Sequence, residues 1–222
     1  MINAHIPLMC FKNKPFNVYC NYESLPVVNV IDKEPVTVSG NNITLSTDKV
    51  VGDYSGAFNN SRLIAYFQNR TATADIVLES YFKLTTNDDS YQEIIQLFQN
   101  ANGEETIAIR FGGSAFGNKL QCGDNIWTLS GLYSTNITKS SVLNQWHHVK
   151  LVRSIADGKG RLYFDGVQQQ LYSHGSGMYI NSFNWVDLMS QFGYCTIGNS
   201  HPTVNEPFKG LLDETKFTQG VL

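Results

Sequence analysis

The chain has 222 residues, of which 42% are hydrophobic, 12% aromatic and only 16% charged. This length and composition predict one large all-β domain, because polar turn-forming residues and 18 glycines take the place of charged ones. The net charge of −3 and the pI near 5.9 provide no basic surface for nucleic acid or an anionic membrane, so neither is expected as a partner. No apolar run reaches the ~20 residues that cross a bilayer, so membrane insertion is not expected.

The first 25 residues show no sustained periodicity and include Pro7 and Pro15. We predict an N-terminal arm over residues 1–25 and a β-sandwich over residues 26–222. The arm contains apolar residues that cannot form an element of their own, so we expect it to contact the sandwich edge or a neighbouring chain. Lys12 and Lys14 interrupt its apolar stretch and no basic segment precedes it, so no signal peptide is predicted.

The four cysteines match neither a zinc site nor a small disulfide scaffold in their spacing. They are Cys10, Cys20, Cys122 and Cys195. We expect reduced, buried thiols, with a Cys10–Cys20 bridge as the alternative.

The middle of the chain alternates between apolar and polar residues with a period of two, which indicates half-buried strands. One predicted face holds Ile76, Leu78, Ser80 and Phe82, and the other holds Glu79, Tyr81 and Lys83. Residues 94–98 are almost continuously apolar, as in a strand covered on both faces. Such segments at short spacing, separated by glycine and asparagine, favour a sandwich of antiparallel sheets.

The C-terminal third carries three motifs in a fixed order. They are the segments Trp146–Arg153, Arg161–Gly166 with its Asp-Gly turn, and Phe208–Phe217. Asp-Gly between apolar runs is a strong hairpin signal. In their residues and their order these motifs resemble the laminin-G-like domains of the concanavalin A-like lectin/glucanase superfamily. The resemblance implies a jelly-roll sandwich of two antiparallel sheets and a role in recognition at a surface.

The same resemblance implies structural roles for residues that match the family motifs. These are Trp146, His148, Asp165, Gly166, Gly210 and Asp213. Trp146 matches the structural tryptophan of the family, so we expect it in the core and expect its truncation to destabilise the protein strongly.

Catalysis is not expected. Hydrolases of the superfamily are similar to one another in an E-x-D-x-E strand, and the nearest segment here, Asp75–Glu79, has valine at its middle position. Its two carboxylates are about 13 Å apart along a strand, beyond the roughly 5–9.5 Å of glycosidase pairs. His147 and His148 are adjacent on a predicted strand and point apart, so they cannot chelate one metal together.

No cofactor is predicted, although Ca²⁺ is an open alternative, because many domains of this family hold Ca²⁺ at a rim of loop carboxylates. Hard oxygen ligands occur at Asp88, Asp89, Asp124, Asn125 and Asp187, without a diagnostic spacing. Asp88, Asp89 and Asp187 are the calcium candidates, and solvated loop carboxylates are the competing interpretation.

Two loop-rich stretches combine aromatic rings with planar polar groups, as a sugar site requires. The predicted ligand-binding residues are Asp124, Asn125, Trp127, Tyr133, His174, Tyr179 and Trp185. Large single aromatic residues are also commonly core residues, so core positions for Trp127 and Trp185 stay open.

The short arm followed by one laminin-G-like domain, together with the lack of a predicted signal peptide, suggests where the protein acts. Short-armed laminin-G-like domains resemble those of bacteriophage tail, baseplate and capsid-surface proteins, which assemble in the host cytoplasm and leave by lysis. We therefore predict a non-enzymatic virion-surface protein that binds glycan, with other virion proteins or further copies of itself as partners. One alternative is a purely structural virion component that docks through its arm. The other is a glycoside hydrolase or lyase.

Overall fold

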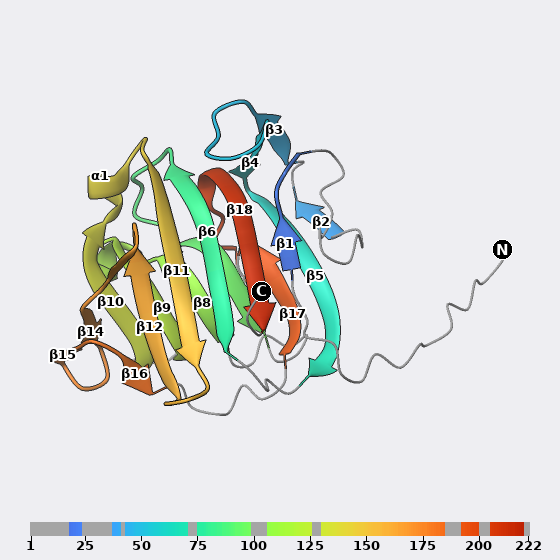
Figure 1. Cartoon of the computed structure of the whole chain (residues 1–222). Helices are drawn as coiled ribbons and strands as arrows, with labels where there is room; N and C mark the ends of the chain where they lie inside the picture. The colour runs from blue at the N-terminus through green and yellow to red at the C-terminus, as the bar shows by residue number, and fades with distance from the viewer. Residues whose placement is uncertain are drawn as a thin grey trace.

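The computed structural model describes residues 18–23, 37–40, 43–70, 75–98, 106–125, 130–184, 192–199 and 205–219. In this part of the chain two antiparallel β-sheets lie face to face, and we call them the front sheet and the back sheet from their places in Figure 1. The predicted all-β jelly-roll sandwich is confirmed. None of the helices in the described residues is long and apolar enough to cross a membrane.

The front sheet has nine strands among the described residues, seven of them in the spatial order β13, β12, β11, β6, β18, β4, β3, while β1 pairs with β18 and β16 pairs with β12. In that order the strands are Val167–Gln168, Lys159–Phe164, Trp146–Ser154, Ile76–Leu84, Lys209–Gln219, Ser55–Asn59, Thr44–Ser46, then β1 (Val18–Cys20) and β16 (Phe183–Asn184).

The back sheet also has nine strands in the described part, in the order β15, β14, β10, β9, β8, β7, β17, β5, β2. In that order they are Met178–Ile180, Leu171–Ser173, Gly131–Thr138, Lys119–Asn125, Thr106–Phe111, Gln92–Phe98, Phe192–Ile197, Ser61–Arg70 and Thr37–Gly40. Two short helices, η1 (Ser114–Phe116) and α1 (Lys139–Val142), flank β9 and β10.

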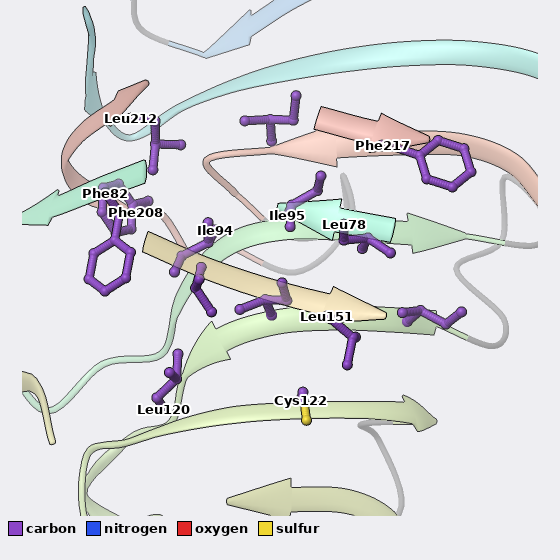
Figure 2. Close-up of a cluster of buried hydrophobic side chains, with 14 of the residues drawn as sticks. Leu78, Phe82, Ile94, Ile95, Leu120, Cys122, Leu151, Phe208, Leu212 and Phe217 are labelled. Atoms are coloured by element: carbon purple, nitrogen blue, oxygen red, sulfur yellow. The ribbon is translucent and has the colours of Figure 1, made fainter. Parts of the chain in front are cut away.

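The central strand β6 shows the predicted alternation. Ile76, Leu78, Ser80 and Phe82 are buried, and the residues between them are half-buried. Strand β7 is buried at every position, which confirms the prediction that it is covered on both faces. The main core lies between the two sheets, where Figure 2 shows Leu78 and Leu151 of the front sheet with Ile95 and Leu120 of the back sheet.

The hairpin between β12 and β13 forms at the predicted Asp-Gly turn. Asp165 and Gly166 both have positive φ, +47° and +79°, as a two-residue turn of the I′ kind requires. The carboxylate of Asp165 also accepts hydrogen bonds from the backbone N–H of His148 and from Nδ1 of His147, each at 2.8 Å. The turn therefore locks the beginning of β11 to the end of β12.

The first strand corrects the predicted domain boundary. β1 pairs in register with β18, Tyr19 opposite Lys216, and lies beside it in Figure 1. Cys20 and Tyr22 are buried in the main core. The sandwich therefore includes residues 18–23, which the sequence pattern places in the arm, while residues 1–17 lie outside the described part. Residues 18–23 are the part of the predicted arm that the structure describes, and the contact expected for residues 1–17 stays a prediction.

Trp146 is not a core residue, and the sequence-based prediction for it is wrong. In β11 the buried positions are Val149, Leu151 and Arg153, so Trp146 belongs to the alternate, outer face and is half-buried. Its indole Nε1 donates a 2.7 Å hydrogen bond to Oδ1 of Asp48.

The three cysteines in the described part, Cys20, Cys122 and Cys195, are buried free thiols. Burial raises the pKa of the Cys20 thiol to about 12, and that of Cys195 also lies well above its ordinary range. They behave as the small hydrophobic residues that the sequence predicts, and Cys10 lies outside the described residues.

Candidate functional site

Polar side chains form a row across the outer face of the back sheet. Strand register places Glu93 of β7 opposite Arg110 of β8, Arg110 opposite Gln121 of β9, and Gln121 opposite Ser134 of β10. Ser134 lies opposite Tyr172 of β14. The inward residues of the same strands, such as Ile109 and Cys122, fill the core, so the alternation of each strand sends this row outward.

Hydrogen bonds connect the row and give it a direction. Nε of Arg110 donates to Oε1 of Gln121 at 3.3 Å, and Nε2 of Gln121 donates to Oγ of Ser134 at 3.1 Å. Oγ of Ser134 lies 2.7 Å from Nε2 of His174. Because arginine can only donate, the amide oxygen of Gln121 faces Arg110 and its nitrogen faces Ser134. The hydroxyl proton of Ser134 finds its acceptor at Nε2 in the tautomer of His174 that carries hydrogen on Nδ1.

His174 is neutral at pH 7. Burial lowers the pKa of its imidazole, and the charge of Lys119 lowers it further. The ring is half-buried and lies edge-on to Phe116 and to Tyr172, with centroid distances of 5.2 Å in both cases. It therefore joins the polar row to a group of aromatic rings.

That group, which we call the aromatic cluster, consists of Tyr91, Phe116, Tyr172, His174 and Tyr179. Tyr172 and Tyr179 are register partners of β14 and β15, with ring centroids 5.3 Å apart, and Tyr91 lies 6.2 Å from Phe116. Tyr179 is 54% exposed and its neighbour Met178 61% exposed. The cluster thus presents one open aromatic face at the edge of the back sheet, where Figure 1 shows β15.

The structure brings together only part of the predicted ligand-binding set. His174 and Tyr179 belong to the aromatic cluster. Asp124 and Asn125 end β9, and their side chains lie outside the described part, as do Trp127 and Trp185 entirely.

Tyr133 does not belong to the site. It is 8% exposed, and its ring stacks on Phe183 in the core at 4.4 Å, so its prediction as a ligand residue is wrong. The sequence could have shown this, since Tyr133 and Ser134 must face opposite sides of one strand.

The predicted ligand-binding set did not include Tyr172, Phe116, Gln121 and Ser134. Tyr172 and Tyr179 lie seven residues apart in one uncharged stretch, which was a usable signal. The other three residues come from separate segments: strand register brings Gln121 and Ser134 together, and Phe116 lies in η1.

The residues at the family-motif positions have clear local roles. The rings of His147 and His148 lie on opposite faces of β11, His147 against Phe164 at 4.8 Å and His148 against Tyr81 at 4.6 Å. A side chain at Gly210 would place its Cβ 2.2 Å from the carbonyl oxygen of Lys83, so only glycine fits there.

Asp213 anchors the loop between β3 and β4. Its Oδ2 accepts hydrogen bonds from the backbone N–H groups of Val50 and Val51, each at 3.0 Å, and its Oδ1 accepts one from the N–H of Glu214 at 2.9 Å. Burial raises the pKa of Asp213 above its ordinary value, while these hydrogen bonds oppose that rise. The residue is structural in its contacts, because each bond it makes holds backbone.

Two calcium candidates, Asp88 and Asp89, already have partners. Oδ2 of Asp88 pairs with Nζ of Lys209 at 2.5 Å. Burial alone would raise the pKa of Asp88, but hydrogen bonds from Lys209 and Ser90 outweigh it and lower the pKa to about 2. Oδ1 of Asp89 accepts a 2.9 Å hydrogen bond from Asn118. The third candidate, Asp187, lies outside the described residues.

The carbonyl oxygens of this loop are also engaged. The buried ammonium of Lys139 donates to the carbonyl of Asp88 at 2.8 Å and to that of Ser90. In the described part of the chain no three metal-ligating side chains gather. We therefore expect that 5 mM Ca²⁺ or EDTA leaves the melting temperature unchanged within about 1 °C, as measured by calorimetry. A calcium-dependent rise of several degrees would contradict this and direct attention to the Asp187 segment.

Glu93 is an unusual buried acid at the closed end of the polar row. Its side chain is fully buried, and neither carboxyl oxygen has a hydrogen-bond partner among the described residues. Burial raises the pKa of Glu93 well above its ordinary 4.5, Arg110 opposes the shift, and Glu206 adds to it. Arg110 is 3% exposed and forms its ion pair with Glu206 at 3.2 Å, which leaves Glu93 as the neutral member.

We expect Glu93→Gln to remove a pH dependence of stability. The folded chain keeps this proton above pH 4.5, where the unfolded chain releases it, so folding takes up a proton and stability falls as pH rises. That slope is about 1.4 kcal/mol per pH unit, until the folded acid ionises. In urea unfolding between pH 5 and 8, the free energy of unfolding of the variant should rise relative to that of the wild type as the pH increases. Asp53→Asn, the same change of acid to amide at a side chain that is 83% exposed, is the control and should show a constant difference.

The fold and the outward aromatic cluster define a lectin-like β-sandwich. A laminin G-type family model, described as the concanavalin A-like lectin/glucanases superfamily, matches residues 57–222. The chain belongs to this superfamily, as its C-terminal motifs predicted. No curated protein matches the sequence.

Solved structures with this fold include proteins with different activities. Botulinum neurotoxin type C, in a structure concerned with its interaction with two ganglioside molecules, matches with a TM-score of 0.54 and 13% identity, over 94% of this chain and 48% of the neurotoxin chain. NanB sialidase of Streptococcus pneumoniae matches with a TM-score of 0.51 and 12% identity, over 76% of this chain and 26% of the sialidase chain. The enzymatically active domain of bacteriophage CBA120 tailspike protein 2 matches with a TM-score of 0.50 and 10% identity, over 85% of this chain and 29% of the tailspike chain.

The chain spans less than half the length of each of these structures. At such low identity the likeness shows a shared fold alone.

Proposed function

We propose that this protein is a non-enzymatic, lectin-like module that binds a glycan at the aromatic cluster. The observation that carries the proposal is the junction at His174 between the aromatic cluster, whose Tyr179 ring is exposed, and a hydrogen-bonded polar row. A sugar ring offers an apolar C–H face and a rim of hydroxyl groups, so it needs an aromatic surface beside directed donors and acceptors. Tyr179 and Tyr172 supply the surface, and His174 supplies a donor.

The distribution of carboxylates supports a binding role over hydrolysis. Glu93 and Glu206, the acids of the polar row, are buried around Arg110. Asp75 accepts a hydrogen bond from the N–H of Ile155 at 2.7 Å, and Glu79 faces His148 and two lysines on the outer face of the front sheet. Glu93 is fully buried and the other three carboxylates are engaged in local bonds, whereas a general acid and its partner carboxylate must both reach the glycosidic bond.

The setting we propose is the surface of a bacteriophage virion, where a glycan-binding module would contact the host or its surroundings. This rests on the layout of the sequence. It makes other virion proteins, or further copies of this chain, the expected neighbours.

Glycan-array binding of the full chain is the primary test, followed by titration calorimetry on the best ligand. Tyr179→Ala removes an exposed ring and should weaken binding about tenfold, equivalent to about 1.4 kcal/mol, without lowering thermal stability. Val167→Ala, a 64% exposed residue at the edge of the front sheet, is the matched control and should bind normally.

Two results would contradict the proposal. One is the absence of binding to every glycan, or binding that Tyr179→Ala leaves unchanged. The other is release of reducing sugar from a polysaccharide that a single Asp or Glu substitution abolishes, which would indicate a glycosidase.

A further inference from the structure

Lys119 brings a cation to the aromatic cluster. It begins β9 directly after η1, and its aliphatic stem runs past Gly117, where a Cβ would lie 3.6 Å from Cε of the lysine. By strand alternation Lys119 shares the outer face with Gln121, the second member of the polar row. The side chain is half-buried, and its ammonium has neither an ion pair nor a hydrogen bond within the described residues.

The acidic side chains on the neighbouring elements are engaged elsewhere. Asp88 pairs with Lys209, Asp89 accepts from Asn118, and Glu206 pairs with Arg110. Phe116 of the aromatic cluster lies three residues before Lys119 and packs edge-on to His174 at 5.2 Å. The positive charge of Lys119 also helps to lower the pKa of that imidazole. A half-buried cation on this face, without a counter-ion in the described part of the chain, leaves this end of the sheet electropositive.

His174 adds a directed donor beside that charge. In the tautomer in which Ser134 donates to Nε2, the ring proton lies on Nδ1, which has no hydrogen-bond partner among the described residues. Arg110 can only donate, so it orients the amide of Gln121 and, through it, the hydrogen bond to Ser134. The aromatic cluster is therefore bordered by two donors, one of them charged, and the described residues bring no acidic side chain to them.

We propose that the glycan recognised here carries a carboxylate on the sugar that binds the aromatic cluster, as uronic and sialic acids do. One carboxylate oxygen accepts from the ammonium of Lys119 and the other from Nδ1–H of His174, while the sugar ring packs on Tyr172 and Tyr179. Charge-assisted hydrogen bonds of this kind are about twice as strong as neutral ones, so the acid and its neutral counterpart should differ clearly. This inference rests on the proposed function and specifies its ligand.

The test compares matched acidic and neutral sugars on the full chain by calorimetry. The pairs are trigalacturonic acid with its methyl ester, and sialyllactose with lactose. At least one acid should bind about tenfold or more tightly than its neutral counterpart. Lys119→Met keeps the aliphatic stem and should remove most of that preference, measured as the ratio of acid to neutral affinity within the variant. Lys49→Met, on a loop of the front sheet, is the control and should bind like the wild type.

The outcomes separate this inference from the proposed function. Equal binding of acid and ester, or an acid preference that Lys119→Met leaves intact, overturns the carboxylate inference. If neutral glycans still bind and Tyr179→Ala weakens them, the proposed function stands. A preference for a sulfated sugar over its carboxylated analogue overturns the inference in favour of a tetrahedral anion. If no sugar of either kind binds, both proposals fall.

Discussion

A chain that begins at Pro26 should be unfolded or aggregated. Such a truncation removes β1 and with it two fully buried side chains, Cys20 and Tyr22. The Tyr22 ring packs edge-on to Phe58 at 5.9 Å and over Gly56, and its hydroxyl donates a 3.0 Å hydrogen bond to Thr215. Losing one buried aromatic ring typically costs about 3–5 kcal/mol, a large part of the roughly 5–15 kcal/mol of a whole domain.

A chain that begins at Asn17 keeps all these contacts and is the matched control. Circular dichroism and urea unfolding of the two truncations should separate them clearly. A further variant, Tyr22→Phe, isolates the hydroxyl and should cost only about 1 kcal/mol. If the Pro26 chain unfolds cooperatively at the same urea concentration as the full chain, β1 is an accessory strand and residues 1–25 form the separate arm that the sequence predicts.

Phe82→Ala should destabilise the protein far more than Trp146→Ala. Phe82 is fully buried and contacts Phe111, Phe164 and Phe208 at centroid distances of 5.6, 6.3 and 6.5 Å. Its truncation leaves a cavity between the sheets and should cost about 3–5 kcal/mol. Trp146 is half-buried on the outer face, so its loss removes one hydrogen bond to Asp48 and part of its packing, about 1–2 kcal/mol.

Urea unfolding of the two variants measures this difference directly. Trp146→Phe keeps most of the apolar surface and should recover part of the loss, because only the indole hydrogen bond is missing. Equal destabilisation by Phe82→Ala and Trp146→Ala would place the tryptophan in the core. The side chains of β11 that are described as outward would then point inward.

Local sequence patterns were enough to predict several structural elements correctly. The alternation over residues 76–83 predicted the correct buried face of β6, since side chains of a strand point alternately to its two sides. The Asp165-Gly166 pair predicted the correct hairpin, because two consecutive positive φ angles are strained for most other residues. Both features depend on residues close together in the chain.

The errors came from positions whose environment is set by distant segments. Trp146 and Tyr133 are large aromatic residues, for which the core and the outer face both provide contacts. Asp48, 98 positions away, gives Trp146 its hydrogen-bond partner. Phe183, which stacks on Tyr133, comes from a strand of the other sheet. Tyr22 reaches the core because β1 pairs with β18, at the opposite end of the chain.

The sequence by itself determined the class of fold, the order of the C-terminal strands and two members of the candidate site, His174 and Tyr179. The tertiary structure decided which partners these two residues have. Arg110, Gln121 and Ser134 become a continuous row only because β8, β9 and β10 pair in one register, and a shift of one residue would turn each of them into the core. Register is a property of paired strands, and no single strand carries it in its own residues.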